Sequence, residues 1–93
     1  MRRTLLPSAA FTRAARKIAK RSAAAATDIQ TALERLAADA FDPRLKTHKL
    51  SGELATSWAC SAGRDLRIIF SFVQHEGAEV VLLESAGSHD EVY

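Results

Sequence analysis

The sequence of 93 residues predicts one α+β domain, in which an N-terminal strand and a two-helix hairpin pack on one face of a mainly antiparallel sheet (β-α-α-β-β-β). Two observations lead to this fold class. Apolar residues recur with a helical period of about 3.6 in the first half of the chain, and they alternate with a period of about 2 in much of the second half. The two helices are then expected to cover the apolar side of the sheet, because no other segment can bury it.

The first strand and the first helix are expected near the N-terminus. Residues 2–6 form the strand candidate, Pro7 ends it, and Ser8 is suited to cap the helix that follows. Apolar residues recur at helical spacing in this helix, at Phe11, Ala14, Ala15, Ile18 and Ala19. Its other face carries the basic side chains Arg13, Arg16, Lys17 and Lys20. The helix is therefore amphipathic and cationic.

A second helix is expected to end near Asp39 and to start at a cap provided by Thr27 or Asp28. Its apolar stripe consists of Ile29, Ala32, Leu33 and Leu36. Residues 22–26 are ambiguous, because an alanine run can either join two helices or belong to the second one. Two helices packed as a hairpin are preferred, since one long helix would not bury both stripes in so small a domain.

The second half of the chain reads as a connector followed by three strands. Residues 41–52, "FDPRLKTHKLSG", form the connector, and strands are expected at 54–61, 66–72 and 79–86 with turns at "AGRD" and "HEG". The last strand is apolar almost throughout and is expected to be central or covered on both faces. Four residues of these strands are expected in the core: Trp58, Cys60, Phe70 and Phe72.

The composition argues against a membrane-spanning, a disulfide-bonded or a metal-cluster protein. No apolar run approaches the ~18 residues of a membrane span, so no membrane partner is expected. The single cysteine excludes an intrachain disulfide and gives no metal cluster, and no cofactor is expected. A cytoplasmic protein is the natural interpretation.

Charge is distributed unevenly along the chain. Residues 1–49 hold 11 Lys/Arg against 4 Asp/Glu, whereas residues 50–93 hold 2 against 7. Such a basic half is suited to phosphate backbones or to an acidic protein partner. The same charge asymmetry would also arise from a solvent-exposed basic helix that binds no partner.

Five residues with complementary chemistry are candidates for a site. Arg67 alternates out of phase with its apolar neighbours and is expected on the uncovered face of the sheet, where His48, Asp65, His89 and Tyr93 join it if the strand ends converge. Such a set suits RNA cleavage by the RNA's own 2′-hydroxyl, which needs a base, an acid and a cation at the phosphate. Histidine can be base or acid near neutral pH, arginine grips phosphate, and an aromatic ring stacks on an unpaired base.

Each candidate also has a structural interpretation. His48 can be a solvated loop residue, and His89 can cap the last strand. Asp65 can be a turn residue that forms a hydrogen bond with its own backbone. Arg67 can form an ion pair with Glu84 or Glu53. Composition and spacing alone therefore lead only to a small α+β domain with a basic helix.

Three motifs resemble a known family. The loop "HKLSG", the strand "DLRIIF" and the C-terminal "GSHDEVY" are similar to the RelE/ParE toxin superfamily, in particular to RelE/YafQ-type mRNA interferases of type II toxin–antitoxin systems. The resemblance extends over nearly the whole chain, since "FTRAARKIAKR" and "LAADAFDPRL" look like the helical hairpin of that family. It implies a RelE-like fold and a ribosome-dependent endoribonuclease that cuts translated mRNA in the A site of the 30S subunit without a metal. It also implies a cognate antitoxin as partner, in a toxin–antitoxin hetero-oligomer.

The resemblance extends to site residues. Functional positions of YafQ-type members match His48, Asp65 and His89, a terminal aromatic matches Tyr93, and the strand arginine of RelE-type members matches Arg67. The expected roles are proton transfer by the two histidines, assistance to one of them by Asp65, a phosphate contact by Arg67 and nucleotide stacking by Tyr93. Sequence-independent RNA contacts are expected from Lys46, Lys49, Arg64, Arg13, Lys17 and Lys20.

The chain departs from the family pattern at three positions. Ser61 stands where YafQ-type members have another catalytic histidine, and Trp58 and Cys60 stand where RelE-type members carry lysines. Two alternatives therefore stay open: a ParE-like inhibitor of DNA gyrase, and a catalytically inactive relic that only binds an antitoxin. The two placed imidazoles favour the interferase, because a gyrase inhibitor has no need of them. The basic helices can also be the docking surface of the antitoxin.

Overall fold

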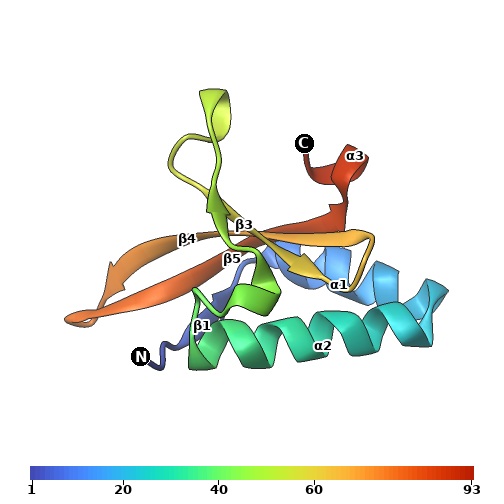
Figure 1. The fold of residues 1–93 in the computed structure, drawn as a ribbon, viewed down its shortest axis with the longest axis horizontal. Helices are drawn as coiled ribbons and strands as arrows, with labels where there is room; N and C mark the ends of the chain where they lie inside the picture. Colours follow the sequence, from blue (N-terminus) through green and yellow to red (C-terminus); the bar gives the residue numbers. More distant parts are fainter.

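A five-stranded sheet with two long helices on one face forms the frame of the molecule (Figure 1). The computed structural model describes residues 1–93. Its elements are β1 (Leu5–Pro7), α1 (Ala9–Arg21), α2 (Ala23–Ala38), the 3₁₀ turn η1 (Pro43–Leu45), β2 (His48–Lys49), the 3₁₀ turn η2 (Gly52–Leu54), β3 (Trp58–Ala62), β4 (Leu66–His75), β5 (Ala78–Ser88) and α3 (His89–Val92). The α+β fold predicted from the sequence is confirmed.

The sheet has the strand order β1-β5-β4-β3-β2. β1 runs parallel to β5, with Leu6 opposite Leu82, and the other pairs are antiparallel. The pairing of β4 with β5 shifts between Ile69 and Phe70, which face Ser85 and Leu83, so one residue of β5 has no partner. β5 lies between β1 and β4 and is therefore an interior strand of the sheet, in agreement with its apolar sequence.

Serine caps explain both helix starts. The Ser8 hydroxyl accepts a hydrogen bond from the Phe11 N–H, as predicted, and the Ser22 hydroxyl accepts one from the Ala25 N–H. The predicted start of the second helix at Thr27 or Asp28 is wrong, because the alanine run lies inside α2. Alanine is the strongest helix former, and Ser22 in extended conformation ends α1 and begins α2 at a single residue.

The main core lies between the helices and the sheet. Phe70 and Leu36 have no exposed surface and belong to one cluster of 13 buried residues drawn from both layers. Cys60 is fully buried, and Trp58 and Phe72 pack against the cluster, so the predicted core positions of the strands are confirmed. None of the three α-helices is both long and apolar enough to cross a bilayer.

The connector departs from the prediction. The strand expected at 54–61 begins only at Trp58. The residues before it form turns: Gly52, with φ 68°, starts η2, and the Ser57 N–H then donates a hydrogen bond to the Leu54 carbonyl at 2.9 Å. The two-residue strand β2, which was not predicted, pairs His48 with Ala59 of β3. The chain from β2 to η2 and the short α3 rise on the side of the sheet away from α1 and α2 (Figure 1).

Candidate functional site

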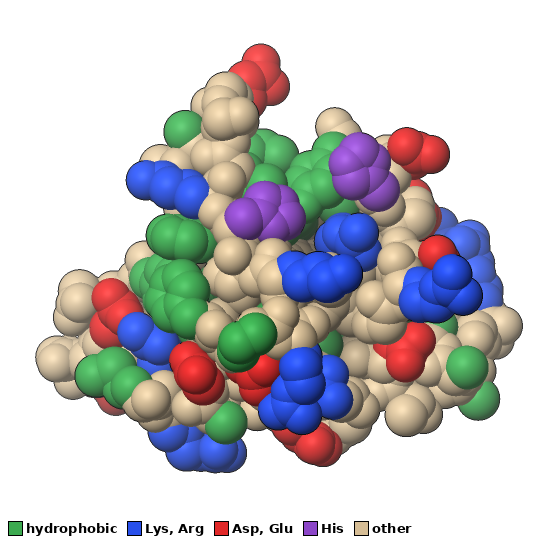
Figure 2. Space-filling view, in the orientation of Figure 1, with side chains coloured by type: hydrophobic (Ala, Val, Ile, Leu, Met, Phe, Trp, Pro, Cys, Tyr) green, Lys and Arg blue, Asp and Glu red, His purple; other side chains and the backbone are tan.

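A hollow on the uncovered side of the sheet is flanked by two segments. One is the chain from residue 46 to residue 57, here called the arm, and the other is α3. Figure 2 shows the hollow between them, with histidine side chains on both sides and Lys/Arg side chains nearby. The site therefore depends on two segments that leave the plane of the sheet, and the strands β3 to β5 lie beneath them.

His48 lies on the arm with its tautomer set by the backbone. Its Nδ1 is 3.0 Å from the Lys46 carbonyl oxygen, and a carbonyl can only accept, so Nδ1 carries the proton. Nε2 of the neutral ring is then an acceptor, and it lies 3.5 Å from the Tyr93 hydroxyl. Lys46 adopts the left-handed conformation with φ 52°, which is uncommon for a residue with a side chain. An unprotonated nitrogen such as this Nε2 is what a general base needs.

Tyr93 also contacts the second imidazole. The rings of His89 and Tyr93 meet edge to face with their centroids 4.4 Å apart. Tyr93 therefore has the His48 Nε2 at its hydroxyl and the His89 ring at its flank. Burial raises the pKa of the Tyr93 phenol above its ordinary 10, while the positive charge of Arg67 acts in the opposite direction. The phenol is thus neutral at physiological pH.

Arg67 is the second residue of β4, where β4 pairs with both β3 and β5. Its cross-strand neighbours are Ser61 on β3 and Gly87 on β5. One guanidinium nitrogen, Nη1, donates to the Leu66 carbonyl at 2.9 Å, and no carboxylate lies within ion-pair distance of the side chain. The alternative of a structural ion pair with Glu84 or Glu53 is therefore wrong. The charge is free to attract an anion.

Asp65 is not part of this contact group. It is exposed in the turn between β3 and β4, where it lines a cavity of about 360 Å³ together with Arg64 and the start of α2. It forms no hydrogen bond or ion pair with either histidine. Among the predicted site residues, direct contacts join His48, Tyr93 and His89.

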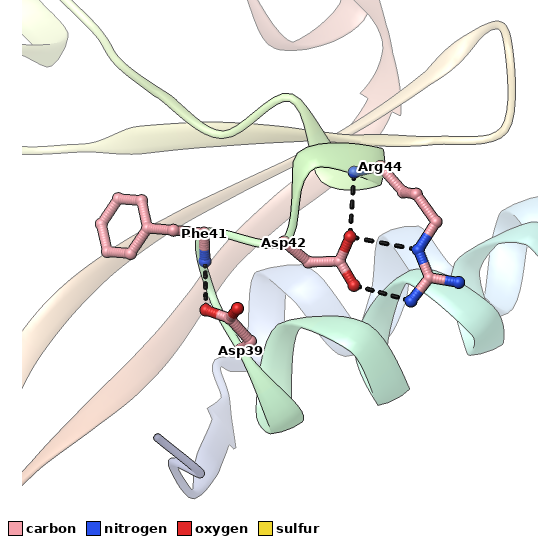
Figure 3. Close-up of polar contacts among 4 residues, drawn as sticks. All are labelled: Asp39, Phe41, Asp42 and Arg44. Carbon is pink, nitrogen blue, oxygen red and sulfur yellow. Dashed lines mark hydrogen bonds and ion pairs between the residues drawn. The ribbon is translucent and has the colours of Figure 1, made fainter.

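The turn η1, which precedes the arm, is capped by a carboxylate that the sequence reasoning missed. Asp42 accepts hydrogen bonds from Arg44 at its backbone nitrogen (2.9 Å), Nε (3.1 Å) and Nη2 (2.7 Å), as Figure 3 shows. These bonds lower the pKa of Asp42 to about 2. The signal was present in "DPR", because an aspartate before a proline is a typical cap of a short helical turn.

The C-terminal end of the arm is anchored to β5. The buried Ser57 hydroxyl donates to Glu84 Oε1 at 2.7 Å, and Ser8 donates to the Glu84 carbonyl at 3.2 Å. Glu84 stands at the irregular position of β5 and was visible as the one carboxylate inside "VVLLESA". Its partner 27 positions away was not visible in the sequence.

The predicted RNA-contact residues fall into three groups. Lys46 and Lys49 lie on the arm beside His48, and Arg64 lies in the β3–β4 turn. Those of the third group, Arg13, Lys17 and Lys20, are exposed on α1. Another cavity, of about 230 Å³, has Ser61 and Arg35 in its lining. No three His, Cys, Asp or Glu side chains converge as metal ligands would.

Comparison with known protein families gives a match over nearly the whole chain. A family model described as the bacterial toxin of type II toxin–antitoxin systems, YafQ, matches residues 3–93. No curated protein gives a significant sequence match.

Solved structures share the fold at low sequence identity. A YoeB/ParE toxin from Agrobacterium tumefaciens superposes with a TM-score of 0.77 at 13% identity, covering 92% of this chain and 98% of that one. YafQ from E. coli has a TM-score of 0.77 at 14% identity, with 98% of each chain covered. The E. coli DinJ–YafQ toxin–antitoxin complex has a TM-score of 0.75 at 14% identity, covering 100% of this chain and 99% of that chain.

Proposed function

Because this chain belongs to the YafQ family of bacterial toxins of type II toxin–antitoxin systems, we propose that it is a ribosome-dependent endoribonuclease that cleaves translated mRNA. The observation that carries the proposal is the contact of Tyr93 with both imidazoles, together with an Arg67 guanidinium that has no ion-pair partner. These are the groups that transfer of an RNA phosphodiester to its own 2′-hydroxyl requires.

The tautomer of His48 suggests how the protons move. With Nδ1 protonated toward the Lys46 carbonyl, His48 Nε2 takes the proton of the substrate 2′-hydroxyl, which would displace the Tyr93 hydroxyl from that position. The 2′-oxygen attacks the adjacent phosphorus and the bond to the 5′-oxygen breaks. His89, in its protonated form, gives its proton to that oxygen. The products are a 2′,3′-cyclic phosphate and a 5′-hydroxyl end.

The other side chains bind rather than transfer protons. Arg67 is the proposed contact of the scissile phosphate, since its guanidinium has no carboxylate partner and only Nη1 is engaged, with backbone carbonyls. Tyr93 is the proposed stacking surface for an unpaired base. Asp65 touches neither imidazole, so proton transfer is assigned to the histidines alone. Lys46, Lys49 and the cations of α1 and the β3–β4 turn provide sequence-independent phosphate contacts.

A protein antitoxin is the proposed partner. The solved DinJ–YafQ complex is a toxin–antitoxin complex of a protein with this fold. By analogy, this chain is proposed to act in the cytoplasm, at the ribosomal A site, and to be neutralised in a hetero-oligomer with its own antitoxin. The surplus of positive charge on residues 1–49 favours an acidic antitoxin segment.

A purified translation system tests the proposal. The toxin, freed from its antitoxin, is added to a reporter mRNA with and without ribosomes, and the cut positions are mapped by primer extension. Cuts within codons that need ribosomes are expected. If the folded protein cuts nothing but inhibits supercoiling by DNA gyrase, the ParE-like alternative replaces the proposal. If it does neither, the chain is an inactive antitoxin-binding relic.

A further inference from the structure

The short helix α3 carries two of the proposed site residues and needs an external anchor. It spans only His89–Val92, and isolated helices shorter than ~12 residues are marginal in water. His89 opens this helix and Tyr93 follows it as the C-cap. Whatever holds the single turn of α3 therefore also places the His89 ring and the Tyr93 hydroxyl.

The first anchor is a reciprocal pair of hydrogen bonds. Glu91 Oε1 accepts from the Ser88 N–H at 2.9 Å, and the Ser88 hydroxyl accepts from the Glu91 N–H at 3.4 Å. This capping box satisfies backbone donors at the start of the helix and joins it to the end of β5. Glu91 is thus the one side chain of α3 that bonds to the strand.

The second anchor is electrostatic. Glu91 lies beside a groove of about 300 Å³ whose other wall is α1, with Arg13, Lys17 and Arg21 in the lining. These three cations are four residues apart on one helix face, and none of them has an ion-pair partner. Glu91 is the only carboxylate of the groove. After the bonds to Ser88, the charges of Arg21 and Lys17 further lower the pKa of Glu91.

A close approach to β5 completes the arrangement. A Cβ atom added at Gly87 would lie 3.0 Å from the Glu91 Cβ and 3.3 Å from Val92 Cγ1. Gly87 is also the cross-strand neighbour of Arg67. The absence of a side chain at Gly87 therefore lets α3 rest on the strand next to the proposed phosphate contact.

We propose that Glu91 is a positioning residue, which holds His89 and Tyr93 over the hollow through its hydrogen bonds to β5 and its attraction to the cationic face of α1. The proposal rests on the proposed function as far as catalysis is concerned, but the placement of α3 stands on its own. Glu91 does not touch the substrate in this scheme. It acts by placing the side chains of His89 and Tyr93.

Three variants separate the two anchors. Glu91→Ala removes both, whereas Glu91→Gln keeps an oxygen for the Ser88 N–H and loses the charge that attracts Lys17 and Arg21. Glu34→Gln, on the exposed side of α2, is the control for loss of one negative charge. Circular dichroism and the midpoint of thermal unfolding establish that each variant keeps the fold.

The placement of α3 is measured by NMR without any RNA. Tyr93 is the only tyrosine of the chain, so the contacts of its side chain with His48 and His89 are readily assigned. These contacts are expected to be strong in the wild type and Glu34→Gln, weaker in Glu91→Gln and absent in Glu91→Ala. Unchanged contacts in Glu91→Ala would overturn the proposal, and unchanged contacts in Glu91→Gln would overturn its electrostatic half.

Cleavage then tests the catalytic consequence. Displacement of a catalytic group by ~1 Å can cost about a hundredfold in rate, so Glu91→Ala is expected to lower kcat by roughly ten- to hundredfold with KM for ribosomes within about twofold. A change in KM alone would contradict a positioning role. If the wild type cleaves no mRNA, the proposed function fails, while the NMR contacts still decide whether Glu91 places α3.

Discussion

The hydroxyl of Tyr93 lies 3.5 Å from Nε2 of His48, although 45 positions separate the two residues in the chain. This contact bridges the hollow from α3 to the arm. Because the same tyrosine ring also meets His89 edge to face, Tyr93 connects both histidines of the candidate site.

Substitutions of Tyr93 separate its ring from its hydroxyl. Tyr93→Ala is expected to slow single-turnover cleavage by roughly ten- to hundredfold, because stacking of a base on an aromatic ring is worth about 1–3 kcal/mol. Tyr93→Phe keeps the ring and loses only the contact with His48, so a reduction of less than about tenfold is expected. Equal losses in both variants would show that the hydroxyl, not the ring, is the important group.

Cys60 is expected to be chemically inert in the folded protein. Burial raises the pKa of its thiol to about 12, against a smaller opposite effect of Arg67. Iodoacetamide at about pH 8 should therefore modify the denatured chain but not the native one, as mass spectrometry can show. Rapid native modification would mean that β3 is more accessible than the structure has it.

The same thiol predicts a loss of stability at high pH. The folded state keeps the Cys60 proton above the ordinary pKa of 9.0, where the unfolded chain releases it. Its contribution to the free energy of unfolding is therefore complete below about pH 9 and is lost as the pH rises toward 12. Urea unfolding of the wild type and of Cys60→Ala across this range measures the effect, and parallel pH dependences would contradict it.

Gly63 is expected to resist substitution for two reasons. Its φ of 65° lies in the left-handed region, and a Cβ atom there would collide with the carboxylate of Asp28 on α2. Gly63→Ala should lower the free energy of unfolding by at least about 1–2 kcal/mol, the cost of the left-handed conformation. Adding Asp28→Ala should restore the part due to the collision. If the double variant is no more stable than Gly63→Ala, the collision does not occur.

Arg44 is expected to control the titration of Asp42. The three bonds from Arg44 lower the pKa of Asp42 from 3.8 to about 2, so the stabilisation is complete above about pH 4 and is lost as the pH falls through 2. Arg44→Ala should return this pKa toward 3.8. An NMR titration of the Asp42 carboxyl carbon measures it, and a pKa that stays near 2 would assign the shift to another cause.

The sequence predicted those parts of the fold that depend on local pattern. The stripes of Ile29 and Leu36 on α2 and of Ile68 and Phe70 on β4 all face the core as expected, because periodicity alone determines which face they occupy. The start of α2 was missed because an alanine run has no apolar period. β2 was missed because two residues are too few to show alternation.

Candidate site residues could be named from the sequence, but their assembly could not be predicted. Alternation along β4 set Arg67 apart from its apolar neighbours, whereas the contact of His48 with Tyr93 depends on how two distant segments leave the sheet. The capping box of Ser88 and Glu91 is a recognisable local motif, and it could have predicted α3, although no helix was expected after the last strand. The pair of Ser57 with Glu84 has no local signature at all.

The most direct test of the proposed reaction compares three histidine variants in the purified translation system. His48→Ala and His89→Ala should each reduce ribosome-dependent mRNA cleavage by at least about a hundredfold, because general acid–base catalysis contributes ~10²–10⁴ in rate. His75→Ala, at the exposed end of β4, should cleave like the wild type and leave 2′,3′-cyclic phosphate ends. Undiminished cleavage by folded His48→Ala or His89→Ala, or a loss as large in His75→Ala, would contradict the assignment of proton transfer to His48 and His89.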